Sequence, residues 1–305
     1  MKTLILHHDD CLRHDPGSRH PERADRVRAV ISAVRGMAGT ELLPAPLASQ
    51  DQVCRAHTPD YWHRLIDLEP DSEAVAVDPD TFLSPGSIKA TLRGSGAACF
   101  AVDQIFAGKS RNAFCVTRPP GHHAGSDFAM GFCLFNQVAV AARHALAEYG
   151  IERVTILDFD VHHGNGTQAI FEQSPEVQYL SSHQMPLYPG TGHPEEIGCG
   201  NILNLPLAPG TGSREFRSAW STLGLPALHG FRPDLVIISA GFDAHLSDPL
   251  GQLELLDEDF GWITGEICRY AKSACSSRVI SVLEGGYDLE ALASASMAHV
   301  EALTS

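Results

Sequence analysis

Short runs of aliphatic and β-branched residues, separated by longer stretches with helical periodicity, limit the folds open to this chain more than any other feature. Six runs have the length and composition of buried strands, at residues 3–7, 113–117, 153–159, 177–181, 234–240 and 279–283. Helix-like stretches alternate with them, at residues 21–35, 58–68, 86–107, 136–149, 212–229, 257–274 and 287–303. Strands that alternate with helices form parallel sheets covered on both faces. The pattern therefore predicts an α/β fold with helices on both faces of a parallel sheet.

The size and charge of the chain narrow its class further. Its 305 residues contain no repeat, low-complexity tract or charged linker, so we expect one domain over residues 1–305. A formal charge of −15 argues against a protein that binds nucleic acid by neutralising phosphates. No apolar stretch approaches the length of a membrane span or a signal-peptide core. The cysteines form no C-x-x-C pair, which favours reduced thiols and a cytoplasmic protein.

The segment at the end of the run at 153–159 carries the strongest chemical signal. Asp158, Asp160 and His162 alternate along an extended chain, so their side chains could share one face. A carboxylate and an imidazole at this spacing are suitable ligands for a divalent metal. A helix-capping carboxylate with surface histidines would explain only one of the two acids. The segment therefore predicts metal ligands.

Asp243 stands just past another predicted strand and is a candidate for a third ligand. Ligands in parallel α/β sheets gather beyond the carboxyl ends of the strands, and Asp243 follows the run at 234–240. An isolated aspartate in this place is more often a turn or cap residue. Only the presence of Asp160 and His162 favours the interpretation of Asp243 as a metal ligand. Two carboxylates and one imidazole leave a coordination position open, as in catalytic zinc sites.

Two further strand ends carry candidates for acid–base chemistry. His122 and His123 follow the run at 113–117, and although adjacent histidines are often surface residues, histidine titrates near neutral pH and can transfer protons. Asp158, if it is not a ligand, could accept a hydrogen bond from one of them. Tyr287 follows a glycine pair after another strand and could donate to an oxyanion, whereas alone it would be a cap on the core.

Taken in order, five motifs of this chain resemble the histone deacetylase superfamily, in particular its class II-like and bacterial amidohydrolase branch. They are RPPGHHAG at 118–125, LDFDVHHGNGT at 157–167, YPGTG at 188–192, SAGFDAHLSDPLG at 239–251 and EGGYD at 284–288. The segment from His20 to Arg23 is similar to the family's HPER pattern. The resemblance implies the single-domain arginase/deacetylase-like fold around an eight-stranded parallel sheet, and so two strands beyond the six.

Carried over residue by residue, the resemblance implies one catalytic Zn²⁺ per chain, with iron as the alternative metal, bound by Asp160, His162 and Asp243. His123 matches the family's general base and later general acid. His122 matches the partner that supports the transition state, and Asp158 matches the acid behind it. Tyr287 matches the residue that polarises the substrate carbonyl.

The resemblance also implies a K⁺ site made of carbonyl and side-chain atoms of Asp158, Asp160, His162, Ser181 and Ser182. Phe132 and Tyr188 match the aromatic walls of an acyl-lysine tunnel, and the backbone at Gly286 would approach the substrate. Asp80 stands in the place of a rim acid that grips the substrate backbone. Leu250 lies in the loop where polyamine-selective members can place a glutamate, which weakens the case for polyamines.

The implied reaction is the hydrolysis of N-acyl amides by metal-activated water, with N-ε-acetyl-lysine in proteins or peptides as the first choice of substrate. Acetylated polyamines are the alternative substrate. Asn165 replaces an Asp of class I relatives and is usual in class II-like ones. A dimanganese ureohydrolase would need an Asp where Gly164 stands. A catalytically silent acyl-lysine-binding protein is the alternative of another class, and neither nucleic acid nor membrane is expected as a partner.

Overall fold

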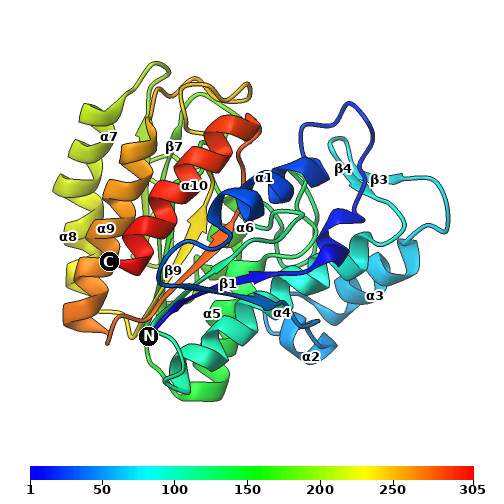
Figure 1. Ribbon diagram of the computed structural model, residues 1–305, viewed down its shortest axis with the longest axis horizontal. Helices are drawn as coiled ribbons and strands as arrows, with labels where there is room; N and C mark the ends of the chain where they lie inside the picture. Colours follow the sequence, from blue (N-terminus) through cyan, green and yellow to red (C-terminus); the bar gives the residue numbers. More distant parts are fainter.

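The computed structural model (Figure 1) describes residues 1–305. It is built around one parallel sheet of eight strands in the order β2-β1-β5-β10-β9-β6-β7-β8. Its strands are β1 (Thr3–His7), β2 (Thr40–Pro44), β5 (Asn112–Cys115), β6 (Val154–Asp158), β7 (Val177–Gln184), β8 (Ile202–Leu207), β9 (Leu235–Ala240) and β10 (Val279–Leu283). A separate antiparallel hairpin pairs β3 (Val75–Asp78) with β4 (Thr81–Leu83).

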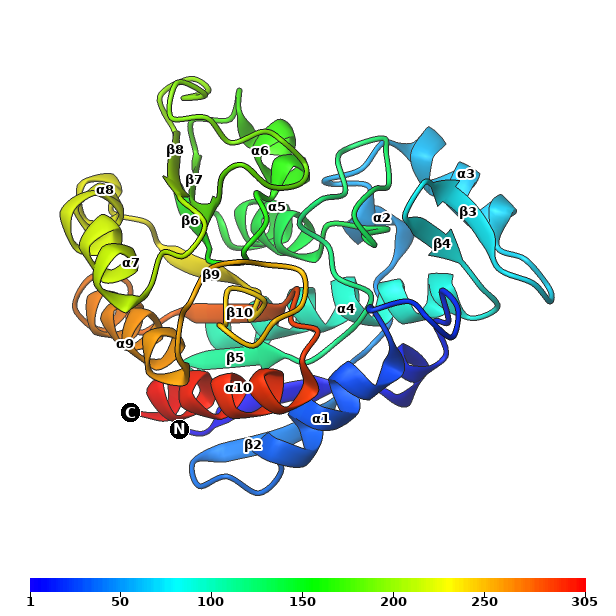
Figure 2. The same ribbon diagram turned by 90° about the horizontal axis from the view of Figure 1, so that it is seen from above.

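Helices cover both faces of the sheet (Figure 2). One face carries α1 (Ala24–Val34), α7 (Ser213–Ala219), η2 (Trp220–Gly224), α8 (Leu225–Phe231), α9 (Asp257–Ala274) and α10 (Leu289–Thr304). The other face carries α4 (Ser87–Phe106), α5 (Gln137–Tyr149) and α6 (Asn165–Phe171). Beside the hairpin lie the short elements η1 (Asp9–Leu12), α2 (Gln50–Val53) and α3 (Pro59–Leu68). None of these helices is long and apolar enough to cross a membrane.

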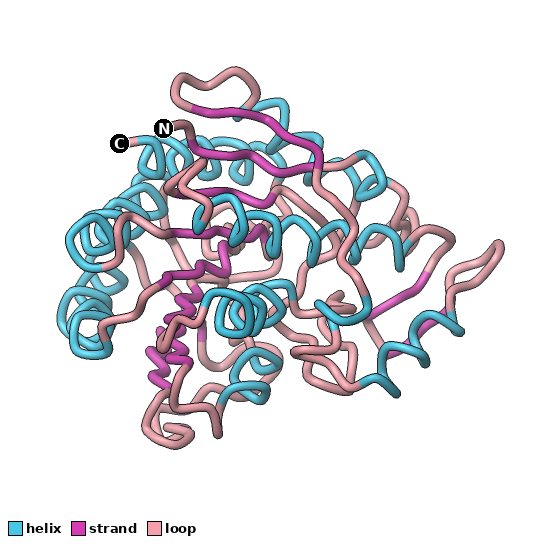
Figure 3. Tube along the Cα trace, turned by 90° about the horizontal axis from the view of Figure 1, so that it is seen from below, coloured by secondary structure: helices cyan, strands magenta, loops and turns pink.

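The strands supply apolar side chains to two separate cores, because successive residues of a strand point to opposite faces. In β1, Leu4 and Leu6 belong to the core under α4 and α5, whereas Ile5 belongs to the core under α1 and α10. In β5, Phe114 faces the second of these cores and its two neighbours face the first. A strand buried on both faces must be apolar throughout, which is why these strands are visible in the sequence. Figure 3 shows the central strands between helices.

The predicted fold class is confirmed, and each of the six predicted strands is present. The two further strands, β2 and β8, lie at the two edges of the sheet. Each contains a proline, Pro44 and Pro206, which an edge strand tolerates because one side of its backbone has no partner. Their mixed composition hides them from a search for apolar runs. The helix expected at 212–229 is divided by the π-helical turn at Trp220–Gly224.

The order of the strands brings four loops together at one end of the sheet. Strands β5, β10, β9 and β6 are consecutive neighbours and all run in the same direction. Their carboxyl ends therefore lie side by side, and the loops that follow them contain every motif in which we expect catalytic or metal-binding residues. This is where ligands bind in open α/β sheets.

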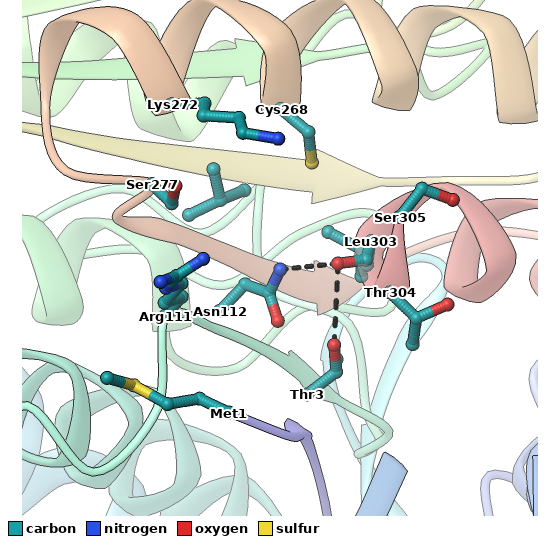
Figure 4. Close-up of a pocket in the computed structure, with 11 residues that line it drawn as sticks. Met1, Thr3, Arg111, Asn112, Cys268, Lys272, Ser277, Leu303, Thr304 and Ser305 are labelled. Carbon is teal, nitrogen blue, oxygen red and sulfur yellow. Dashed lines mark hydrogen bonds between the residues drawn. The ribbon is translucent and has the colours of Figure 1, made fainter. Parts of the chain in front are cut away.

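A small cavity of about 90 Å³ lies at the opposite, amino end of the strands (Figure 4). Thr3, Asn112 and Val279, which line it, begin β1, β5 and β10. The side chain of Asn112 donates to the carbonyl of Leu303 at 2.5 Å and fixes the end of α10. No histidine or carboxylate side chain lines this cavity. This hydrogen bond at the edge of the cavity attaches α10 to the sheet. None of the expected catalytic groups lines the cavity.

We predict that acid destabilises the fold, because two histidines outside the four loops are buried in their neutral form. Burial lowers the pKa of His299 to about 3 and that of His57 to about 4. The unfolded chain binds these protons below about pH 6.5, so stability present at neutral pH is lost as the pH falls toward 4. Each histidine should lower the free energy of unfolding by up to about 1.4 kcal/mol per pH unit in this range. Urea unfolding at pH 7.5, 6 and 5 measures the effect.

The variant His299→Gln tests the assignment, because glutamine does not titrate but can still bond to Thr264 and Ser281, which now contact the two ring nitrogens at 2.6 and 2.8 Å. Its unfolding free energy should depend less steeply on pH than that of the unsubstituted chain. An equal dependence would show that His299 is not a source of acid lability.

Candidate active site

Three side chains converge where β6 and β9 end. Asp160 and His162 follow β6, and Asp243 follows β9. Nδ1 of His162 lies 3.1 Å from Oδ1 of Asp160 and 3.1 Å from Oδ2 of Asp243. One possible ligand atom from each residue lies within 4.8 Å of those of the other two. The structure thus brings together the three residues that the sequence nominated as metal ligands.

Backbone groups hold the two carboxylates in place. Oδ2 of Asp160 accepts from the N–H of Gly285 at 2.8 Å, and Oδ1 of Asp243 accepts from the N–H of Val161 at 2.8 Å. A Cβ atom at Gly285 would lie 2.0 Å from Oδ2 of Asp243, and one at Gly241 would lie 2.0 Å from Oδ2 of Asp160. Glycine is therefore required at both positions for the backbone to approach the carboxylates this closely.

The charges at this point suit a divalent cation. Burial, together with the charge of Asp160, raises the pKa of Asp243 to about 7. Burial alone would lower the pKa of His162, but hydrogen bonds to both carboxylates raise it to about 10. Two buried carboxylates thus compete for a proton on the imidazole between them. A divalent metal would replace that proton and balance both charges, so the donor set fits the catalytic zinc that the sequence predicts.

His122 is held by a carboxylate behind it. Its Nδ1 donates to Oδ2 of Asp158 at 3.0 Å, and the phenol of Tyr179 donates to the same oxygen at 2.9 Å. Nε2 of His122 lies 3.9 Å from Oδ2 of Asp160. Burial would lower the pKa of His122, yet the charges of Asp160 and Asp158 raise it to about 10. Both carboxylates therefore favour the cationic form of His122.

His123 has the opposite character. Its Nδ1 donates to Oδ1 of Asn165 at 2.7 Å, and the amide orientation of Asn165 is set by a contact of Nδ2 with the sulfur of Met130 at 3.2 Å. Burial and the repulsion of His122 and His162 lower the pKa of His123 well below its usual value. The imidazole is therefore neutral at pH 7, with Nε2 free to accept a proton.

The loop after β10 carries Tyr287, and opposite charges hold the peptide unit before it. The carbonyl of Gly286 accepts from Nε of Arg26 at 2.6 Å, and the N–H of Tyr287 donates to Oδ2 of Asp248 at 2.7 Å. The guanidinium of Arg26 also lies over the tyrosine ring, 4.8 Å from its centroid. Burial raises the pKa of Tyr287 well above its usual value, so the phenol keeps its proton.

The two expected tunnel aromatics flank these groups. The ring of Tyr188 is edge-on to that of His123, with centroids 5.4 Å apart. The ring of Phe132 is edge-on to that of Tyr287, with centroids 5.9 Å apart. Both side chains remain partly exposed, as the walls of an entrance would be.

Asp80, the expected rim acid, lies in the turn between β3 and β4. Its Oδ1 accepts from the N–H of Gly131 at 3.0 Å, and the neighbouring Thr81 hydroxyl accepts from the N–H of Phe132 at 2.9 Å. Gly131 and Phe132 both have left-handed backbones, with φ of 56° and 68°. The hairpin thus holds the strained segment that presents Phe132.

The remaining nominated residues lie in β7 and in the loop after β9. Ser181 pairs with Asp158 in the register of β6 and β7, and both Ser181 and Ser182 are buried. Leu250 is partly exposed in the loop that follows β9, where its N–H donates to Oδ1 of Asp248 at 3.0 Å.

Sequence reasoning gave no role to four groups that the structure places in contact with this site. They are Arg26, Tyr179, Asp248 and Glu284. Asp248 lies in the motif at 239–251 and Glu284 in the motif at 284–288. A charged residue in an otherwise apolar strand end or loop was the sequence feature that could have identified both. Arg26 and Tyr179 belong to a helix and a strand with no motif of their own. Only the packing of α1 and β7 against the loops brings them near the catalytic groups.

A family model described as a histone deacetylase domain matches residues 20–303. A crystal structure of the HDA15 HD domain superposes with a TM-score of 0.92 at 35% sequence identity, covering 99% of this chain and 90% of that one. Both matches include the site described above.

Among curated proteins, the histone deacetylase-like amidohydrolase of Pseudomonas aeruginosa is 37% identical over 88% of this chain and 71% of its own length. The type-2 histone deacetylase 2 of Dictyostelium discoideum is 36% identical over 95% of this chain, which spans only 20% of that longer protein.

Proposed function

The chain belongs to the histone deacetylase family, and from this membership we propose that it is a zinc-dependent deacylase that hydrolyses N-acyl amides, foremost N-ε-acetyl-lysine in proteins or peptides. The observation that carries the proposal is the meeting, at four adjacent strand ends, of a metal-ligand triad with a cationic and a neutral histidine and a protonated tyrosine. Each of these groups can contribute to amide hydrolysis by activated water.

Asp160, His162 and Asp243 would hold the zinc ion. When bound, it supplies a Lewis acid that polarises the amide carbonyl and makes the attacking water more acidic. The remaining chemistry belongs to side chains of the chain itself.

His123 is the proposed general base and later general acid. Because Asn165 accepts from its Nδ1–H, the free Nε2 can take a proton from water and afterwards deliver it to the leaving amine. His122, whose cationic form the charges of Asp160 and Asp158 favour, would stabilise the negative charge that develops during attack. The products are the free amine and the carboxylate of the acyl group.

Tyr287 would donate its phenol proton in a hydrogen bond to the substrate carbonyl as that oxygen becomes negative. Phe132 and Tyr188 would enclose the lysine methylenes and exclude water, while the backbone at Gly286 would lie beside the acyl group. Asp80 would accept from the substrate backbone at the rim. The apolar side chain of Leu250 supports acyl-lysine over a polycationic substrate.

We also propose a K⁺ site formed by Asp158, Asp160, His162, Ser181 and Ser182. The pairing of β6 with β7, which sets Ser181 beside Asp158, supports it. Residues 1–305 would act as one catalytic domain around the single large sheet. All eight cysteines are free, which supports a reducing compartment such as the cytoplasm.

A parallel kinetic comparison tests the function. Acetyl-lysine peptides, longer acyl-lysine peptides and acetylated polyamines are assayed with and without a chelator. We expect the highest kcat/KM with acetyl-lysine peptides, lost on chelation and restored by Zn²⁺. A higher kcat/KM with acetylated polyamines would assign the chain to polyamine hydrolysis, and zinc-loaded protein inert toward all three classes would indicate a binding protein.

The variant Asn165→Asp should move the acidic limb of the pH profile of kcat/KM to higher pH. A carboxylate beside His123 stabilises its protonated form and raises its pKa, by roughly 1–3 units for such a pair. The base works only when it is neutral, so activity that the unsubstituted enzyme shows at pH 6 should fall, while activity near pH 9 is largely kept. The kcat/KM profile from pH 5 to 10 measures this, and an unmoved limb would contradict the role of His123.

A further inference from the structure

Glu284 is a fully buried carboxylate at the end of β10, and none of its contacts makes an ion pair. Its Oε2 accepts from the N–H of Gly121 at 2.7 Å and from the N–H of His122 at 3.2 Å. Its Oε1 accepts from the hydroxyl of Ser239 at 3.1 Å. Arg26 donates to the backbone carbonyl of Glu284 and not to its carboxylate. The side chain is 0% exposed.

Such a group is a costly way to fill the core. Taking a carboxylate out of water without a cationic partner costs several kcal/mol, and apolar side chains of similar volume are often no less stable in such places. Burial accordingly raises the pKa of Glu284 to about 7. The charge of His122 and the N–H of Gly121 lower that pKa and so offset only part of the cost of burial, which leaves the contacts of its oxygens as the reason for an acid here.

The carboxylate connects two of the four loops that form the site with the last residues of strand β9. It is part of the loop that presents Tyr287, it binds the end of β9 through Ser239, and it holds two consecutive peptide groups of the loop that presents the tandem histidines. The hydrogen bond to Asp158 holds the ring of His122, and the N–H of Thr167 holds its carbonyl at 3.0 Å, but neither contact involves the N–H groups of Gly121 and His122. Glu284 supplies the acceptor for that backbone.

We propose that Glu284 is a positioning residue, whose carboxylate fixes the peptide N–H groups of Gly121 and His122 and so sets the place of the tandem histidines relative to Tyr287. The expected effect of Glu284 on turnover rests on the proposed deacylase function, whereas its hydrogen bonds to the two N–H groups do not. Displacing catalytic groups by about 1 Å can cost roughly 100-fold in rate. Because Glu284 touches neither the tunnel aromatics nor the metal ligands by hydrogen bonds, substrate affinity and metal content should be unaffected.

The variants Glu284→Ala and Glu284→Gln separate hydrogen bonding from charge. Glutamine keeps an oxygen that can accept from both N–H groups and offers its amide to Ser239. We expect Glu284→Ala to lower kcat by roughly 100-fold with KM within about threefold and zinc content unchanged, and Glu284→Gln to recover most of kcat. An unchanged kcat in Glu284→Ala would overturn the proposal. So would a loss in Glu284→Gln as large as in Glu284→Ala, because the charge would then be what matters.

A control for general destabilisation is Asp259→Ala, although Asp259, unlike Glu284, also forms an ion pair with Arg217 at 2.6 Å. Asp259 is also a buried carboxylate that accepts from a backbone N–H, that of Leu256 at 2.9 Å, but it lies at the start of α9. It should lose stability and keep the kcat of the folded enzyme. If Asp259→Ala lowers kcat as much as Glu284→Ala, the effect is general destabilisation and the proposal fails.

Amide hydrogen exchange of Gly121 and His122 tests the contact without any activity. These amides should exchange at least about tenfold faster in Glu284→Ala and at nearly the unsubstituted rate in Glu284→Gln. Equal protection in all three proteins would overturn the proposal even if the enzyme is active. If the unsubstituted chain hydrolyses no acyl amide but the exchange pattern is as expected, the proposed function fails and the positioning contact stands.

Discussion

Replacing Asp243 by asparagine is expected to abolish zinc binding and to lower deacylase turnover by at least about 1000-fold, which corresponds to about 4 kcal/mol of barrier. The substitution removes one of only two negative charges that would hold the ion. The fold should survive, because the asparagine oxygen can still accept the N–H of Val161 that Asp243 accepts at 2.8 Å. Zinc content by elemental analysis and turnover of an acetyl-lysine peptide measure the two effects.

The metal-free proteins provide the control for this experiment. In the metal-free state Asp243→Asn should be at least as stable to urea as the unsubstituted chain, because it removes the repulsion between two buried carboxylates. Chelated unsubstituted enzyme should regain turnover on addition of Zn²⁺, and the variant should not. A variant that keeps a full zinc complement and normal turnover would eliminate Asp243 as a ligand.

Removal of the tyrosine hydroxyl in Tyr287→Phe should lower kcat roughly 100- to 1000-fold, because one lost oxyanion donor costs about 2.7–4 kcal/mol. Phenylalanine keeps the ring contacts with Arg26 and Phe132 and the backbone bond to Asp248. The melting temperature should therefore change little. Turnover and thermal unfolding of the same preparation measure both, and an unaltered kcat would remove Tyr287 from the mechanism.

The strands that could be located from the sequence are those buried on both faces of the sheet. Strands such as β6, β9 and β10 must be apolar along their whole length, and this made them visible as short aliphatic runs. The edge strands β2 and β8 carry polar residues and prolines, since one side of each lacks a strand partner. The motif resemblance implied their existence, but no pattern in the residues located them.

The metal ligands and acid–base groups could be nominated because each stands within a few residues of a predicted strand end. Asp160 and His162 are two residues apart, and the alternation of an extended chain suggested a shared face, but β6 ends at Asp158 and both residues lie in the bend that follows it. Their meeting with Asp243 could be expected from the rule that parallel strands present their carboxyl ends at one edge. The opposite pKa shifts of His122 and His123 could not be predicted from the sequence. They depend on burial and on the distances to Asp158, Asp160 and Asn165.

The sequence by itself determined the parallel α/β class, the ends of the central strands and the residue types available for chemistry, because these depend on local composition and on periods of two and 3.6 residues. The tertiary structure alone decided which buried groups hold the catalytic ones. Arg26 and Glu284 are 258 positions apart in the chain, yet a side chain of one bonds the backbone of the other. Such contacts arise from the order in which strands and helices pack, and no local pattern encodes that order.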